Sequence, residues 1–287
     1  MPASWKGLLD RVRPKKYGRK HSLILLNGLA EQAESWYRNA RFWGRFFDVH
    51  MPSLMAYEGD ALHRRIRSGE PVTVEYLVDQ LHTYVDQFVQ TPPYHLVSSS
   101  LGGKVAVEFA ARYPELVNRI VLLNPSGMGD RERLPIMDGG RVNDYEKIVR
   151  SVFYRPRKAD RTMLHYYRRC FQSRKWKLGL IRTVKGTNDH LVRPLMKQIP
   201  HTTLLIGGKE DQIVDHLEGE RAAVEMPNGH WLSLPRCGHA PQIEMPRLVN
   251  RLVVHFLTSP NPSAQPNFVK LLLNKPSRVL VLSLIHI

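Results

Sequence analysis

Three consecutive serines, Ser98 to Ser100, precede two glycines in HLVSSSLGGKVAVEFAARYPE. A serine can act as a nucleophile on a sharp strand-to-helix turn that has small residues two positions before and after it. Ser100 fits this pattern, because Gly102 follows two positions later and Ser98 stands where the first glycine is usual. A serine- and glycine-rich loop without a chemical role is the alternative, and this stretch alone leaves it open.

A serine hydroxyl becomes a nucleophile only beside a base, which an acid must hold in the correct tautomer. Asp211 follows a strand-like run in LLIGGKEDQIV, and His239 lies in the Gly-His-Ala-Pro turn of LPRCGHAPQIEMP. The order Ser100, Asp211, His239 is the chain order of one known type of Ser-His-Asp triad. The three residues together therefore predict acyl transfer through a serine nucleophile.

Other side chains compete for the acid and base roles. The rivals are two carboxylates near Asp211 and two histidines at the end of a basic segment: Glu210, Asp215, His190 and His201. Cys237 lies two residues before His239, and we expect it to be a small packed residue because Ser100 already fits the nucleophile position.

The elements that would position these residues alternate between apolar runs and helical patterns, which is typical of a parallel sheet covered on both faces. The strand candidates are SLILLNG, FDVHMP, YHLVSS, NRIVLLNPSG, TTLLIGG and HWLSLPRCGH. The helix candidates are residues 34–47, 73–89, 101–115 and 246–257. In the second of these, four residues are spaced to form one apolar face: Leu77, Leu81, Val85 and Phe88. The sequence predicts the α/β fold class, interrupted by a helical insertion of about 70 residues.

The net charge of +16 is concentrated in two segments. Residues 1–20 carry seven Lys/Arg and one Asp, and residues 130–199 carry eighteen Lys/Arg and seven Asp/Glu. The remainder of the chain is close to neutral. This distribution argues against a protein that binds nucleic acid over its whole surface.

Two features bear on the compartment. No run of about 18 apolar residues is present, so we expect no membrane span, and the basic N-terminus lacks the apolar stretch of a signal peptide. The two cysteines, Cys170 and Cys237, fit no metal-ligand spacing. We expect a cytoplasmic, reduced protein.

From about Ser22 to Leu257 the sequence resembles the α/β-hydrolase superfamily, in particular its lid-bearing members. VSSSLGGKVAVEFAARYPELVNRIVLLNP resembles the nucleophile elbow, its helix and the next strand, while GKEDQIV and CGHAPQIEMP resemble the acid and histidine loops. LLNGLAEQAESW resembles the His-Gly-x segment of the family. Asp211 and His239 occupy the acid and base positions, and the G-x-x-D spacing from Gly208 favours Asp211 over its rivals.

The sequence departs from the family pattern in two loops. Asn27 stands where histidine is usual, which matters little if the donor there is the backbone N–H of Leu29. VHMPSLMAYEGD aligns with the family's D-x-P-G-x-G-x-S stretch, but only Pro52 matches, and we expect an altered shape there without lost chemistry.

The resemblance implies an α/β-hydrolase fold: a mostly parallel sheet with helices on both faces and a helical lid. It implies that Ser100 attacks an acyl carbon, that His239 takes the proton, and that backbone N–H groups of Leu101 and Leu29 form the oxyanion hole. The expected activity is hydrolysis of an ester or related acyl bond through an acyl-enzyme. No metal or organic cofactor is implied.

Two other functions remain open. One is a carbon–carbon bond hydrolase acting on ring-cleavage-type diketo acids, and the other is a non-catalytic ligand-binding protein on the same scaffold. We expect a small-molecule acyl substrate, and an anionic one if lid cations such as Arg168, Arg169 or Arg182 steer it. The lid cations otherwise form a solvated basic face. A cationic face for anionic lipid or nucleic acid is a third possibility.

The expected organisation divides the chain as follows: a basic arm at 1–20, a hydrolase core at 21–129 and 200–258, a helical lid at 130–199, and a tail at 259–281. The last six residues, Leu282 to Ile287, resemble the translation of a sequencing-library adapter and are expected to be an artefact. The oligomeric state is left open.

Overall fold

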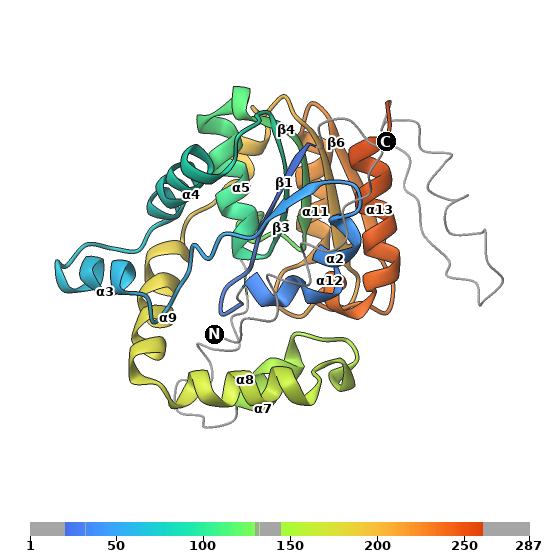
Figure 1. Ribbon diagram of the computed structural model, residues 1–287. Coiled ribbons are helices and arrows are strands. Elements are labelled where there is room, and N and C mark those ends of the chain that lie inside the picture. Colours follow the sequence, from blue (N-terminus) through green and yellow to red (C-terminus); the bar gives the residue numbers. More distant parts are fainter. Residues whose placement is uncertain (1–20, 32, 130–131, 133–144, 261–287) are drawn as a thin grey trace.

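The computed structural model describes residues 21–31, 33–129, 132 and 145–260 (Figure 1). Six strands form one sheet in the order β2-β1-β3-β4-β5-β6, and every neighbouring pair is parallel. The strands are β1 Ser22–Leu26, β2 Asp48–His50, β3 Tyr94–Ser99, β4 Val117–Leu123, β5 Thr202–Gly208 and β6 Gly229–Leu234. This sheet confirms the α/β class and the six strand candidates.

Helices cover both faces of the sheet (Figure 1). One face packs against α4 (Val74–Phe88), α5 (Leu101–Arg112) and α11 (His216–Glu225). The other packs against α2 (Ala40–Trp43) and α13 (Pro246–Thr258). Within β1, Leu23 and Leu25 belong to the second core while Ile24 and Leu26 belong to the first. Successive side chains of a strand point to opposite faces of the sheet. A strand with helices on both faces therefore needs apolar residues at nearly every position, which is why a continuous apolar run predicts a buried strand.

Two helix expectations were wrong in detail. Residues 34–47 form a short 3₁₀ helix, η1 Ala33–Arg38, followed by the single turn of α2, and not one continuous helix. Phe88 does not lie on the buried face of α4, because it is the last residue of the helix and 61% of its surface is exposed. Its ring instead contacts Tyr84 one turn earlier, at a centroid distance of 5.2 Å.

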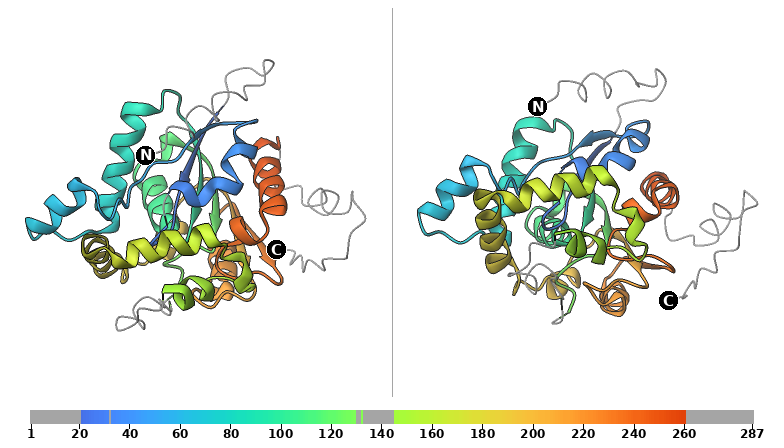
Figure 2. Two further views of the ribbon diagram at one scale, coloured as in Figure 1. Left: turned by 60° about the horizontal axis from the view of Figure 1, so that its bottom comes forward. Right: turned by 90° about the horizontal axis from the view of Figure 1, so that it is seen from below.

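The segment between β4 and β5 is helical in its described part. It comprises α7 Tyr145–Ser151, η3 Pro156–Lys158, α8 Arg161–Gln172, α9 Arg174–Thr187 and α10 Arg193–Met196. In Figure 1, α7 and α8 lie side by side below the sheet, and both views in Figure 2 place α8 in front of one end of it. The lid role and the domain boundaries of this segment stay predictions.

The remaining helices are α3 Asp60–Arg67, η2 Pro114–Leu116 and α12 Pro241–Glu244. Across the described ranges, no helix combines the length and the apolarity that crossing a membrane requires. The predicted arm at 1–20, residues 261–281 of the predicted tail and the final six residues lie outside the described part of the chain.

Candidate active site

Ser100 lies on the turn between β3 and α5. Its backbone has φ 48° and ψ −119°, a region that a residue with a side chain occupies only when its surroundings force it there. Three hydrogen bonds hold the turn: Ser100 N–H donates to Leu123 O at 3.1 Å, and Ser100 O accepts from Gly103 N–H at 2.8 Å and Ser126 N–H at 3.1 Å. The strained turn leaves the Ser100 side chain half-buried at the start of α5.

The position of Gly102 shows why this turn requires a small residue two positions after Ser100. A Cβ atom at position 102 would overlap the carbonyl oxygen of Leu26 in β1. The first turn of α5 therefore passes β1 more closely than a side chain allows. Ser98, the small residue on the other side of Ser100, is fully buried in the sheet.

Asp211 and His239 form a buried pair. His239 Nδ1 lies 2.7 Å from Asp211 Oδ2, and the Asp211 side chain is 0% exposed. The other carboxylate oxygen, Oδ1, accepts hydrogen bonds from Ile213 N–H at 2.7 Å and Val214 N–H at 3.3 Å. With its two oxygens facing these three nitrogens, the Asp211 side chain orients the imidazole and favours the tautomer with its proton on Nδ1, which leaves Nε2 free to accept a proton.

The rival residues have other partners. Glu210 accepts a hydrogen bond from Cys237 N–H at 3.0 Å, and Asp215 caps α11 by accepting from Leu217 N–H at 2.9 Å. His190 lies between carboxylates of α4 and α5, and His201 Nε2 is 2.9 Å from Pro114 O beyond the far end of α5. Cys237 is buried in the core as expected.

Asn124 connects the end of β4 to the Asp211 and His239 loops. It follows β4, its Nδ2 donates to Gly238 O at 2.9 Å, and its Oδ1 accepts from Gly208 N–H at 2.8 Å. Among the described residues, no hydrogen bond joins the Ser100 hydroxyl to His239. Such bonds are often long in a free enzyme and shorten when substrate binds, so the separation leaves the predicted roles open.

The loop after β1 passes directly beside Ser100. A Cβ atom built on Gly28 would lie 3.0 Å from Ser100 Cβ and 3.3 Å from the carboxyl carbon of Glu31. Glu31 Oε2 accepts from Gly28 N–H at 2.9 Å, and Tyr57 Oη accepts from Ala30 N–H at 2.9 Å. No described residue accepts a hydrogen bond from the Leu29 N–H. That donor is thus available beside the serine, as an oxyanion donor must be.

Two further carboxylates influence His239, and the sequence analysis missed both. Burial opposes the charged imidazole, but Asp211, Glu31 and Glu132 outweigh it and hold the pKa of His239 above its ordinary value. Desolvation in turn raises the pKa of the Glu31 carboxyl. Nothing in the local pattern of NGLAEQ identifies Glu31, because its role depends on where the loop places it.

Lys104 is a third residue that the sequence analysis missed, although its unusual position in the sequence could have identified it. It lies one turn after Ser100 in the apolar helix LGGKVAVEFAAR, where a lysine is out of place. The side chain is 1% exposed, donates to Thr187 O at 2.8 Å and Asn188 O at 3.0 Å, and lies 4.0 Å from Glu132. Burial lowers the pKa of Lys104. Lys104 ties the helix behind the serine to the end of α9.

The histidine loop is fastened to residues 152–155, which we call the strap. His239 N–H donates to Val152 O at 2.8 Å. The buried Glu244 carboxylate accepts from Tyr154 N–H at 3.1 Å and Arg155 N–H at 3.0 Å, and also from Gly238 N–H at 2.6 Å. A Cβ atom on Gly238 would lie 2.6 Å from Tyr154 N, so the two segments are in direct contact.

We expect Glu244→Ala to lower the free energy of unfolding by about 3 kcal/mol, because it leaves three buried or half-buried N–H groups without an acceptor. Thermal or denaturant unfolding measures the effect. Glu146→Ala is the matched control, since Glu146 is exposed and, among the described residues, forms its ion pair with Arg150 on α7, a contact worth less than about 0.5 kcal/mol. Equal destabilisation by the two variants would contradict a fastening role for Glu244.

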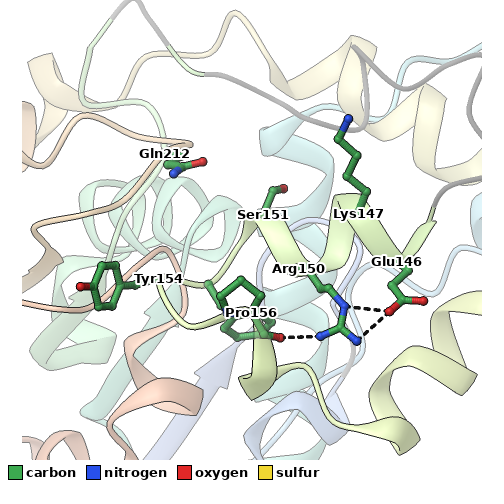
Figure 3. Close-up of a pocket in the computed structure, with 8 residues that line it drawn as sticks. Glu146, Lys147, Arg150, Ser151, Tyr154, Pro156 and Gln212 are labelled. Atoms are coloured by element: carbon green, nitrogen blue, oxygen red, sulfur yellow. Dashed lines mark hydrogen bonds and ion pairs between the residues drawn. The ribbon is translucent and has the colours of Figure 1, made fainter.

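A surface pocket of about 520 Å³ opens on the outer side of the strap (Figure 3). Its lining is Glu146, Lys147, Arg150, Ser151, Phe153, Tyr154, Pro156 and Gln212. Figure 3 shows Arg150 turned toward Glu146 and the backbone oxygen of Pro156, 2.7 and 2.9 Å away. Ser100, Asp211 and His239 do not line this pocket, so it is distinct from the candidate triad.

The profile described as "Alpha/beta hydrolase family" matches residues 23–252. The monoacylglycerol lipase abhd6-B of Xenopus laevis is 24% identical over 274 residues, which cover 85% of this chain and 77% of that protein. The 2-hydroxy-6-oxo-6-phenylhexa-2,4-dienoate hydrolase of Burkholderia cepacia is 26% identical over 282 residues, covering 88% of this chain and 94% of that protein.

Two solved structures share the fold. A serine hydrolase from the bacterium Cycloclasticus zankles superposes with a TM-score of 0.72 at 20% identity, covering 83% of this chain and 90% of that one. A meta-cleavage product hydrolase from Pseudomonas fluorescens gives a TM-score of 0.72 at 21% identity, covering 85% and 93%. These similarities extend over nearly the whole described part of the chain.

Proposed function

The chain belongs to the alpha/beta hydrolase family, and from that premise we propose that it is a serine hydrolase cleaving esters of uncharged substrates. Family membership and fold confirm the resemblance read from the elbow and the two loops after it. The observation that supports the serine mechanism is the buried Asp211–His239 pair at 2.7 Å, positioned by the loops after β5 and β6.

The proposed reaction begins when His239 Nε2 takes the proton of Ser100 Oγ as the oxygen attacks the acyl carbon. Asp211 stabilises the imidazolium, which then protonates the departing alcohol. The negative oxygen of the intermediate is held by the N–H groups of Leu29 and Leu101. Leu101 begins α5, so the helix dipole also favours charge there. Each such donor contributes about 3 kcal/mol to lowering the barrier. Water, activated by His239, releases the acid.

Glu31 favours an uncharged substrate. A Cβ atom on Gly28 would lie 3.3 Å from the Glu31 carboxyl carbon and 3.0 Å from Ser100 Cβ, and Glu31 also raises the pKa of His239. Glu132 contributes less, because Lys104 lies 4.0 Å away and offsets its charge. At an effective dielectric constant of about 20, two unit charges about 8 Å apart repel by about 2 kcal/mol, which is about 30-fold in binding. A carboxylate on the substrate would therefore bind poorly, and the anionic substrate considered from the basic insertion is the weaker candidate.

Carbon–carbon bond hydrolysis is the second candidate function. The similarity to the Burkholderia cepacia hydrolase, which covers 94% of that protein, favours it. A diketo acid carries a carboxylate, so the two functions differ in the charge that the site must accept.

The test compares, at about pH 8, an aryl ester of a neutral acyl chain with the same ester ending in a carboxylate and with a vinylogous diketo acid. We expect the parent to prefer the neutral ester in kcat/KM by about 30-fold, and Glu31→Gln to reduce that preference. Glu31→Gln should also move the acid limb of the pH–rate profile to lower pH, because the active form has neutral His239 and loss of a nearby carboxylate lowers its pKa.

Glu34→Gln provides the matched control, since Glu34 is an exposed glutamate three residues later. It should change neither the preference nor the profile. Faster turnover of the diketo acid than of either ester would replace ester hydrolysis by carbon–carbon cleavage. A parent that prefers the charged ester would contradict the role assigned to Glu31.

A further inference from the structure

The charged residues of the two long helices between β4 and β5 are all basic. Residues 161–187, which span α8 and α9, contain eight Lys/Arg and no Asp/Glu. All eight side chains are exposed: Arg161, Arg168, Arg169, Arg174, Lys175, Lys177, Arg182 and Lys185. A solvated helix surface ordinarily mixes charges of both signs, so this one is suited to an anionic partner.

The charge on α9 surrounds an apolar centre. Leu178 and Ile181 are 42% and 46% exposed. At 3.6 residues per turn they point about 60° apart, with Arg174 and Lys185 between them and Lys177 and Arg182 at the sides. The opposite side of the helix is buried, and its Trp176 ring packs on Tyr57 at 5.4 Å. The outer face of α9 thus consists of two aliphatic side chains within a ring of cations.

Most of these cations have no acidic partner in the described part of the chain. Lys175 pairs with Asp60 at 3.1 Å. For the other four cations of α9 no carboxylate of a described residue lies within ion-pair distance. Their charge is therefore available to attract an anion from solution.

The apolar centre decides which anionic partner fits. Proteins that bind single-stranded nucleic acid place aromatic rings among their cations, where bases stack. The outer face of α9 has aliphatic side chains there, and its one aromatic residue, Trp176, is buried. Cations around exposed Leu and Ile are the pattern of helices that lie in the headgroup region of an anionic bilayer.

We propose that the outer face of α9 docks onto an anionic lipid surface. Leu178 and Ile181 enter the boundary between headgroups and acyl chains, while Arg174, Lys177, Arg182 and Lys185 pair with lipid phosphates and carboxylates. The buried side of α9 contacts Tyr57, whose hydroxyl accepts the Ala30 N–H beside the predicted oxyanion donor. Docking would place that side of the molecule against the lipid. This binding does not depend on the proposed ester hydrolysis.

The experiment is flotation of the full chain carrying Ser100→Ala, with vesicles of phosphatidylcholine alone and with vesicles in which phosphatidylserine replaces about a third of it. We expect binding only to the second kind. Lys177→Glu with Arg182→Glu should weaken it at least about 25-fold, because each cation near an anionic bilayer contributes about fivefold. Leu178→Ser with Ile181→Ser should weaken it about tenfold at unchanged charge.

The control is Arg247→Glu with Arg251→Glu on α13, which makes the same charge change on the opposite side of the molecule (Figures 1 and 2). It should leave binding within about twofold of the parent. Equal weakening by the two charge-reversal pairs would show attraction by net charge alone and overturn the proposal. So would an unaffected Leu178→Ser, Ile181→Ser variant, or binding of an oligonucleotide but not of vesicles.

Discussion

Ser100→Ala is expected to abolish covalent labelling by a fluorophosphonate and to lower ester turnover on the order of a million-fold. The hydroxyl oxygen forms the bond to the acyl carbon in the proposed reaction, and no other described nucleophile lies on a strained turn between a strand and a helix. Alanine tolerates the φ of 48° about as well as serine does, so the turn and its backbone hydrogen bonds should persist. Intact mass after exposure to the probe, together with steady-state kinetics, measures both effects.

Ser99→Ala is the matched control for this variant. Ser99 is buried, and its hydroxyl accepts a hydrogen bond from Gln242 Nε2 at 3.1 Å, so it points toward α12. The variant should lose about 1 kcal/mol of stability and still be labelled once. An adduct on Ser100→Ala would show that another residue is the nucleophile. A folded parent that takes no label would favour the ligand-binding protein on a hydrolase scaffold.

Asp211→Asn is expected to lower kcat about ten-thousand-fold with little change in KM. The amide oxygen can still accept from Ile213 and Val214 N–H, so the loop should keep its shape. The amide cannot accept the Nδ1 proton while its oxygen faces those groups, and it cannot stabilise an imidazolium. His239 would then turn its protonated nitrogen toward Ser100, where a base is required.

Glu210→Gln tests whether the effect belongs to Asp211 alone. The change in charge is the same and is one residue away, and glutamine can still accept the Cys237 N–H. Turnover by this variant should remain close to that of the parent. Comparable losses in both variants would mean that the acid loop contributes through its total charge and would contradict the triad assignment.

The core of the fold followed from local patterns because the central strands are buried on both faces and stand out as short runs. YHLVSS and TTLLIGG have the length of strands, and both became central strands with almost every residue buried. The wrong predictions concern segments whose structure is determined by contacts with other elements and not by the local sequence. Residues 34–47 have helical composition, yet they form two short helical turns, each of which contributes one tryptophan, Trp36 or Trp43, to the core, where the rings pack at 5.9 Å.

In the candidate site, too, some residues could be predicted from the local sequence and others could not. Asp211 and His239 were predicted as a pair from chain order and from the resemblance of their loops to the family. The structure brings their side chains together, while their catalytic roles stay predictions. Glu31 and Glu132 belong to loops that are distant in sequence from His239, and nothing near them records which loop they will face. Glu244 ends α12 shortly after His239, but its partners Tyr154 and Arg155 are distant in sequence. Lys104 is intermediate, because a lysine within an apolar helix signals a buried partner but not that partner's identity.

The strap has a consequence for how this protein can diverge. Three hydrogen bonds join residues 152–155 to the histidine loop and Glu244, and one of them uses the backbone of His239 itself. A recombination that exchanged everything between β4 and β5 would keep these bonds only if the new segment placed its backbone groups at the same points, and would otherwise shift the proposed base. A crossover after Arg155 leaves all three in place. Exchange from Pro156 onward therefore disturbs the histidine least, provided that the new segment still accepts from Lys104 where Thr187 and Asn188 do.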